Sequence, residues 1–104
     1  MTVAEKILTS QFNISGNSEY TFKMNGGIIA LTTRTIQHGA GFINIPMYES
    51  GAFIIAQSSE LYVAGDTSIK NKIAVWKDGE TGLVHIKNTW DATFVMFMCK
   101  ICYN

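Results

Sequence analysis

Charge is scarce in this chain: only 15% of its 104 residues are Asp, Glu, Lys or Arg, against about 25% in an average soluble domain. Eight basic and eight acidic residues give no net charge, and the basic residues, including the single arginine Arg34, are not clustered. Nucleic-acid binding depends on clustered cationic side chains, so nucleic acid is not an expected partner. With so little charge to cover a small domain, we expect another subunit to cover part of its surface.

Long apolar runs and a targeting segment are also lacking. No stretch approaches about 18 uninterrupted apolar residues, so no insertion into a membrane is expected. The N-terminus has no basic start followed by an apolar core, which predicts a protein made in the cytoplasm without a signal peptide. The length fits one domain over residues 1–104, with residues 1–10 as an N-terminal arm.

Cysteine and histidine are too few for most metal enzymes. The chain has two of each: Cys99, Cys102, His38 and His85. A cupin-type centre needs several closely placed histidines, so it is excluded. Residues three apart in a strand point to opposite faces, which favours two free thiols over a disulfide. A zinc site formed by these four residues is the alternative that the sequence leaves open.

The carboxylates give no sign of catalysis. Glycoside hydrolysis needs one carboxyl group held protonated by an apolar setting. The candidate residues all fall at expected turns, where solvated side chains are the simpler explanation. They are Glu49, Glu60, Asp66, Asp78, Glu80 and Asp91. We therefore expect no catalytic residue, no cofactor and no enzyme activity, with a small β-sandwich enzyme as the least favoured alternative.

The pattern that is present throughout is alternation of apolar and polar residues with a period of two, typical of β-strands. The expected strands are 10–14, 20–24, 27–31, 42–48, 52–56, 61–64, 72–77, 83–87 and 93–103. Residues 3–9 are the only stretch with a helical pattern, and Pro46 should end its strand or place it at an edge. Short strands separated by turns predict an all-β antiparallel sandwich of the jelly-roll type.

Three of these strands are apolar on both faces, namely 27–31, 52–56 and 94–99. A sandwich strand with one wet face should alternate, so the outer face of these strands is expected to meet a partner subunit. The other interpretation is that loops cover them, or that small residues face water. The partner interpretation predicts a homo-oligomer, a trimer before a dimer. Its expected interface residues are Phe94, Met96, Phe97 and Met98.

Aromatic side chains near strand ends are the remaining candidates for ligand binding, because a flat apolar ring with polar neighbours suits a sugar or a partner chain. Trp90, in a polar connection, is the most surface-like of them. The candidate ligand-binding residues are Trp90, Trp76, Tyr48, Tyr62, Asn44 and Asp66. At each of the aromatic residues, packing in the core or in an interface is the competing interpretation.

Residues 20–22, 26–31, 72–76 and 84–88 and the closing apolar strand together resemble C-terminal head domains of phage tail fibres and related prophage proteins. The resemblance covers residues 18–103 and implies a jelly-roll-like trimer, a virion component that binds a cell-surface receptor or glycan. It assigns no individual binding residue. The alternative is a free-standing, lectin-like carbohydrate-binding module.

Overall fold

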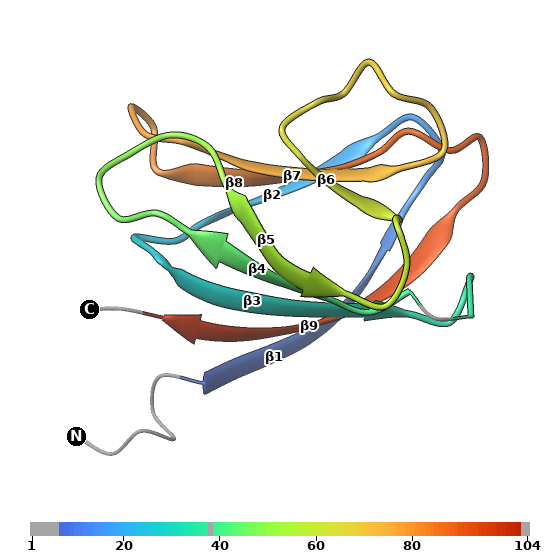
Figure 1. Ribbon diagram of the computed structural model, residues 1–104, viewed down its shortest axis with the longest axis horizontal. Coiled ribbons are helices and arrows are strands. Elements are labelled where there is room, and N and C mark those ends of the chain that lie inside the picture. Colours follow the sequence, from blue (N-terminus) through green and yellow to red (C-terminus); the bar gives the residue numbers. More distant parts are fainter. Residues whose placement is uncertain (1–6, 38, 103–104) are drawn as a thin grey trace.

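The computed structural model describes residues 7–37 and 39–102, and within these ranges it contains strands, bends and turns but no helix (Figure 1). The strands are β1 (Ile7–Ile14), β2 (Glu19–Lys23), β3 (Gly27–Thr33), β4 (Gly41–Ile45), β5 (Phe53–Gln57), β6 (Tyr62–Ala64), β7 (Ile73–Asp78), β8 (Leu83–Asn88) and β9 (Phe94–Cys102). The all-β prediction is confirmed. A helix long and apolar enough to span a bilayer is not found in the described part of the chain.

The strands form two sheets that pack face to face (Figure 1). The larger sheet has the order β1-β9-β3-β4-β5 and the smaller one β2-β8-β7-β6. This confirms the predicted sandwich. Neighbouring strands are antiparallel except β6 and β7, which run parallel because residues 65–72 return the chain to the end where β6 began.

The first strand differs from the expectation. A helix over residues 3–9 is wrong at residues 7–9, which begin β1, and residues 1–6 lie outside the described residues. The expected arm over residues 1–10 is replaced by strand structure from Ile7 onward. Uninterrupted pairing with β9, from Ile7 opposite Ile101 to Ile14 opposite Phe94, supplies partners that an isolated arm would not have. The other strands lie close to their expected positions, and β4 ends at Ile45, immediately before Pro46.

The core lies between the sheets and is built from the alternate residues of each strand. In β3 and β4 the inward side chains are Ile29, Leu31, Ile43 and Ile45, all with no exposed surface. They face an equally buried set from the smaller sheet, Ile73, Val75, Val84 and Ile86. Each such side chain contributes about 1.5–3 kcal/mol when it leaves water, so this layer is the main source of stability.

Lys77 is an exception to the apolar interior. Its side chain is only 3% exposed, although it carries a charge. The ammonium group donates hydrogen bonds to the backbone carbonyls of Asn25, at 2.6 Å, and Pro46, at 3.1 Å. The lysine thereby ties the turn after β2 and the end of β4 to β7.

Tyr62 also lies in the core, where it is 2% exposed, and this corrects its assignment as a ligand-binding residue. Its hydroxyl donates a hydrogen bond of 2.6 Å to the carbonyl oxygen of Gly39. Burial raises the pKa of this hydroxyl well above its ordinary value of about 10. The ring lies directly over Gly41, where a β-carbon would come within 2.7 Å of it.

Tyr62→Phe is expected to lower the free energy of unfolding at neutral pH by about 1 kcal/mol, because the Gly39 carbonyl loses its donor. Above about pH 10 the unfolded chain loses the phenolic proton while the folded chain keeps it, so the stability of the wild type falls as pH rises. The variant lacks this contribution, and its deficit should therefore shrink between pH 10 and 11. Urea unfolding at pH 7, 10 and 11 measures this, with Tyr48→Phe at a side chain 88% exposed as the control at neutral pH.

Candidate functional site

Among the described residues, the candidate metal ligands do not come together and the two cysteines do not pair. Cys99 lies on the outer side of β9, whereas Cys102 packs against the core, and both thiols are free. Within the described residues there is no group of three or more His, Cys, Asp or Glu side chains that could hold a metal. His38 lies outside the described residues. His85 stacks on Trp76 on the smaller sheet, with ring centroids 4.8 Å apart, and contacts Glu19 at 3.1 Å.

Two of the turn carboxylates, Asp66 and Asp78, are stabilised in their charged form. A side-chain hydrogen bond from Ser68 lowers the pKa of Asp66, and the backbone N–H of Glu80 lowers the pKa of Asp78. A general acid in glycoside hydrolysis needs the opposite shift, toward a carboxyl group that keeps its proton at neutral pH. Both residues therefore act as turn-forming groups in this structure.

The predicted ligand-binding residues do not meet in one place. Trp90 is half-buried against the core, tilted over Phe94 with ring centroids 5.5 Å apart. Tyr48 is in the connection after β4, and Asp66 is in the one after β6. The remaining two lie on the outer sides of different sheets, Trp76 on β7 and Asn44 on β4. These residues do not form a common binding site.

Of the four predicted interface residues, three belong to the core. Phe94, Met96 and Met98 are at most 3% exposed and point toward the smaller sheet. Only Phe97 of the four is on the outer side, where the guanidinium of Arg34 lies over its ring, 5.6 Å from the centroid. Because residues 94–99 are apolar without interruption, the sequence did not show which alternate set pointed inward. The structure shows that Phe97 belongs to the outward set. It lies opposite Gln11 of β1 and Thr32 of β3, and both of these side chains are exposed on the outer side of the sheet.

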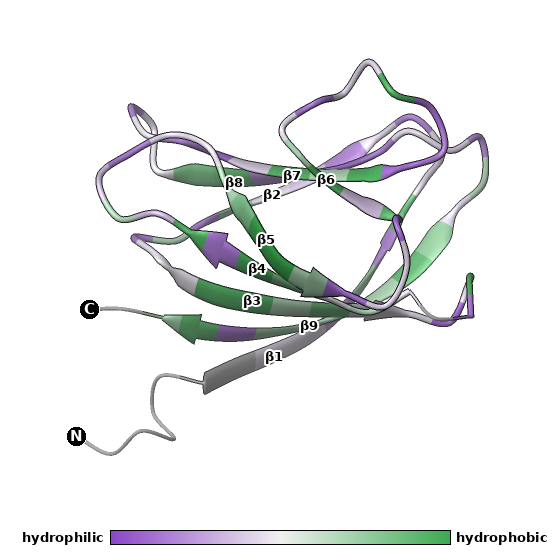
Figure 2. Cartoon of the chain, in the orientation of Figure 1, coloured by the Kyte–Doolittle hydropathy of each residue, from purple (hydrophilic) through white to green (hydrophobic). Residues whose placement is uncertain are grey.

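The outer side of the larger sheet is a continuous surface without a charged side chain on its strands, and we call it the uncharged face. Its strands contain one charged residue, Lys100, which is turned toward the smaller sheet and lies over the ring of Phe22. Figure 2 shows the long hydrophobic stretches of β3, β5 and β9 and the hydrophilic residues gathered in loops. The uncharged face consists of Thr9, Gln11, Asn13, Ile28, Ala30, Thr32, Phe42, Asn44, Phe53, Ile55, Ala56, Val95, Phe97, Cys99 and Ile101.

Cross-strand pairing arranges this face in rows. One row consists mostly of small side chains and crosses all five strands in the order Thr9, Cys99, Ala30, Phe42 and Ala56. The next row carries bulkier residues: Ile101, Ile28, Asn44 and Phe53. Directly opposed side chains on one face lie about 4.5–5.5 Å apart, so each row forms a contiguous strip.

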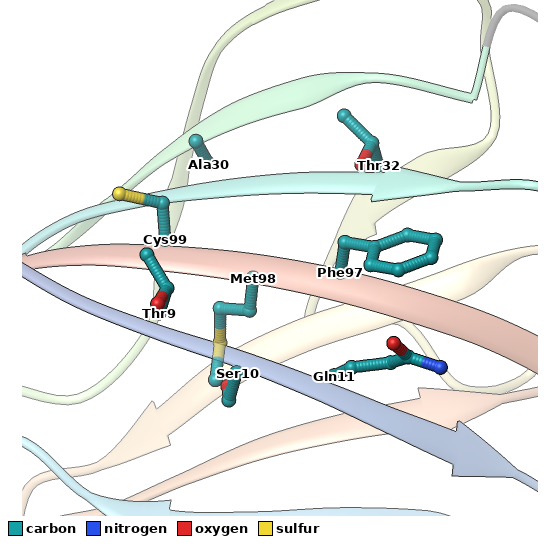
Figure 3. Close-up of a pocket in the computed structure, with 8 residues that line it drawn as sticks. All are labelled: Thr9, Ser10, Gln11, Ala30, Thr32, Phe97, Met98 and Cys99. Atoms are coloured by element: carbon teal, nitrogen blue, oxygen red, sulfur yellow. The ribbon is translucent and has the colours of Figure 1, made fainter.

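Two depressions follow the row of small residues. The larger, of about 460 Å³, lies over β1, β9 and β3, and Figure 3 labels its lining residues, among them Thr9, Phe97 and Cys99. The smaller, of about 280 Å³, lies beside Phe42 and Ala56 on β4 and β5. Both are lined by uncharged side chains, so neither offers the ionic groups that would orient a charged substrate.

Several large hydrophobic side chains on this face are open to solvent. Phe53 is 65% exposed, Phe42 55%, Ile55 48% and Ile101 44%. The smaller sheet differs, because its outer side carries Glu19, Lys23 and Lys87. The sequence analysis predicted an outer apolar surface on residues 52–56, which include Phe53 and Ile55, but it named neither residue as an interface residue. It missed Phe42 and Ile101, although the alternation of Phe42 with inward Ile43 was a usable signal.

Comparison of the chain with protein-family models, with curated proteins and with solved structures finds no match.

Proposed function

We propose that this chain is a non-catalytic structural and recognition domain of the viral or phage-fibre type, which assembles with further copies of itself through the uncharged face. The observation that carries this proposal is the exposure of Phe53, Phe42, Ile55 and Ile101 on one sheet surface whose strands contribute no charged side chain to it. A charged group that does lie against this face is the guanidinium of Arg34, from the connection after β3, which lies 5.6 Å from the centroid of the Phe97 ring. Removing apolar surface from water contributes about 25 cal/mol per Å², so covering the exposed apolar side chains favours association.

A second copy is the partner that fits best. A surface whose strands contribute no charged side chain is complementary to another such surface, since little hydrated charge is lost when they meet. The chain itself carries such a surface and has no net charge that would keep copies apart. The same proposal includes three features that the fibre resemblance implies: jelly-roll connectivity, a trimer, and binding of a cell-surface receptor or glycan.

Phe42→Glu tests the proposal, because it removes an exposed ring and adds a charge to the centre of the uncharged face. Loss of a central interface residue costs about 2 kcal/mol or more, which is about a 30-fold weaker association. Size-exclusion chromatography with light scattering at several concentrations measures this. The matched control is Ile69→Glu, which also replaces an exposed apolar side chain with Glu, at a residue 41% exposed in the connection between β6 and β7.

The masses of the wild type and of the two variants decide whether the chain assembles through the uncharged face. Dissociation by Phe42→Glu with no effect of Ile69→Glu supports assembly through the uncharged face. A wild-type chain that stays monomeric at all concentrations contradicts self-assembly.

One observation favours the lectin-like alternative. Trp76 and His85 are stacked at an interplanar angle of 5° on the outer side of the smaller sheet, and the imidazole contacts Glu19. An aromatic ring beside groups that donate and accept hydrogen bonds suits a sugar. Binding to a glycan array that Trp76→Ala abolishes, by a chain that is monomeric, would favour this alternative over the fibre type.

A further inference from the structure

The free edge of β1 is the least protected strand edge in the described part of the molecule. β1 forms one border of the larger sheet and, among the described strands, pairs with β9 alone (Figure 1). Its eight residues include no charged residue and no proline, and its pairing with β9 runs without a bulge. Proteins normally protect an edge with Lys, Pro, a bulge or a very short strand, because an open edge pairs readily with another chain.

The other three edges do show such protection. β2 carries Glu19 and Lys23, β6 has only three residues, and the pairing of β5 with β4 shifts register between Phe42 and Ile43. The lack of protection at β1 is therefore specific to this strand. The depression over β1, β9 and β3 begins at the same border, where Thr9 and Gln11 form its β1 side (Figure 3).

We propose that β1 pairs with β1 of a second copy, antiparallel across a two-fold axis at Ser10. Residues that lie directly opposite each other in an antiparallel pair have their side chains on the same face of the sheet. The outward residues of one β1 must therefore lie opposite outward residues of the other, which limits the possible registers. With the axis at Ser10, Thr9 of each copy lies opposite Gln11 of the other, and Ser10 lies opposite Ser10. The outward Thr9 and Gln11 then form polar cross-strand pairs of a hydroxyl with an amide.

Ser10 is an independent reason for placing the axis there. Its hydroxyl oxygen is buried and has no hydrogen-bond partner among the described residues. Buried polar groups are normally paired, and an unpaired one marks a place where a partner is expected. Across this axis the two Ser10 hydroxyls reach each other when each side chain rotates about its Cα–Cβ bond toward the edge of β1, and one then donates to the other.

This arrangement joins two five-stranded sheets into one sheet of ten strands. The uncharged faces of the two copies then form a single surface on one side of the assembly. The inference rests on the proposed self-assembly and adds a second contact to it, at the edge of β1, which leaves the uncharged face free to meet further copies. Because the contact has two-fold symmetry, it predicts an even number of copies: a dimer, or a hexamer where it joins two of the proposed trimers.

Gln11→Lys tests the pairing, because Gln11 is exposed and the substitution leaves the core untouched. In the paired dimer the two new charges are diagonal neighbours about 7–8 Å apart and repel. We expect the dissociation constant measured by light scattering to rise at least about tenfold. The matched control is Thr21→Lys, at an exposed position of the charged edge strand β2, which should leave the mass unchanged.

A cross-link tests the register without depending on charge. Ser10→Cys, combined with Cys99→Ser and Cys102→Ser, should give a covalent dimer under mild oxidation, since it places two thiols directly opposite each other. The same background with Gln37→Cys, at an exposed turn residue, should not. Circular dichroism establishes that each variant is folded.

Three results overturn the inference. A wild-type trimer, or an oligomer that Gln11→Lys leaves intact and Phe42→Glu dissociates, rejects β1 pairing and leaves assembly through the uncharged face standing. Failure of Ser10→Cys to cross-link rejects the register. A monomer at all concentrations rejects both β1 pairing and the proposed self-assembly.

Discussion

Gly27→Ala is expected to destabilise the fold by more than about 4 kcal/mol, a large share of the total stability of about 5–15 kcal/mol that a domain has. Gly27 opens β3 and lies opposite Cys102 of β9. A β-carbon there would come within 2.0 Å of the carbonyl oxygen of Ile101 and 3.0 Å of the α-carbon of Cys102. Both are backbone atoms of a paired strand, so the clash is relieved only by separating β3 from β9.

Gly51→Ala is the matched control for this substitution. Gly27 has φ of 146° and Gly51 has φ of 106°, so alanine is strained at both positions. A β-carbon at Gly51 would nevertheless meet no atom within 4 Å. The control should cost about 1–3 kcal/mol from backbone strain alone.

The difference in free energy of unfolding between Gly27→Ala and Gly51→Ala measures the cost of the clash between β3 and β9. Urea unfolding followed by circular dichroism gives both free energies, and soluble yield serves if Gly27→Ala does not fold. A melting temperature changes by about 4–8 °C for each kcal/mol in a domain of this size, so the two variants are readily separated. Equal losses of stability in both variants would contradict the contact between Gly27 and Ile101.

The sequence predicted strands well where polar and apolar residues alternate. The hairpin of β7 and β8, around the turn at residues 78–82, lies within a residue of its expected position because both strands and the turn carry local signals. The apolar last strand, β9, lies between β1 and β3 and so is not at a sheet edge. The start of β1 was not predictable, because its pairing with β9 joins residues about 90 positions apart.

The candidate site was harder to predict because it depends on which side of a strand faces the core. Residues 94–99 are apolar throughout, so the predicted interface included Phe94 and Met96, which belong to the core. The uncharged face becomes visible only when five strands lie side by side. The burial of Lys77 was likewise hidden, since the carbonyls that accept its hydrogen bonds come from Asn25 and Pro46, far away in the sequence.

Asn88 is the other residue for which we expect a large effect. It has no exposed surface, and it connects the chain before β2 with the chain after β8. Its side-chain amide donates to the carbonyl oxygens of Ile14, at 3.0 Å, Ser15, at 3.3 Å, and Ala92, at 2.7 Å. Its side-chain oxygen accepts the backbone N–H of Trp90 at 2.8 Å. One buried side chain therefore holds two connections at the same end of the sandwich.

Asn88→Asp keeps the shape of this side chain and the bond from Trp90 but replaces the donor group with an oxygen. Three carbonyl oxygens then face a carboxyl group that cannot donate to them when it is ionised. Leaving an uncompensated charge in the interior costs about 3–5 kcal/mol, and we expect a loss of this size at pH 7. Gln37→Glu, the same change of amide to carboxyl at an exposed turn residue, should alter stability by less than about 0.5 kcal/mol.

The pH dependence of Asn88→Asp identifies the cause of its loss of stability. Burial and the facing carbonyls raise the pKa of the new carboxyl group in the folded state above its unfolded value of about 3.9. The folded state therefore binds more protons, and the stability deficit relative to the wild type should shrink as pH falls toward 4. Asn88→Ala also loses the hydrogen bonds but gains no ionisable group, so its deficit should stay constant between pH 4 and 7. A deficit of Asn88→Asp that is independent of pH would show that the carboxyl group escapes to solvent, and that the chain around Asn88 opens more easily than its three hydrogen bonds imply.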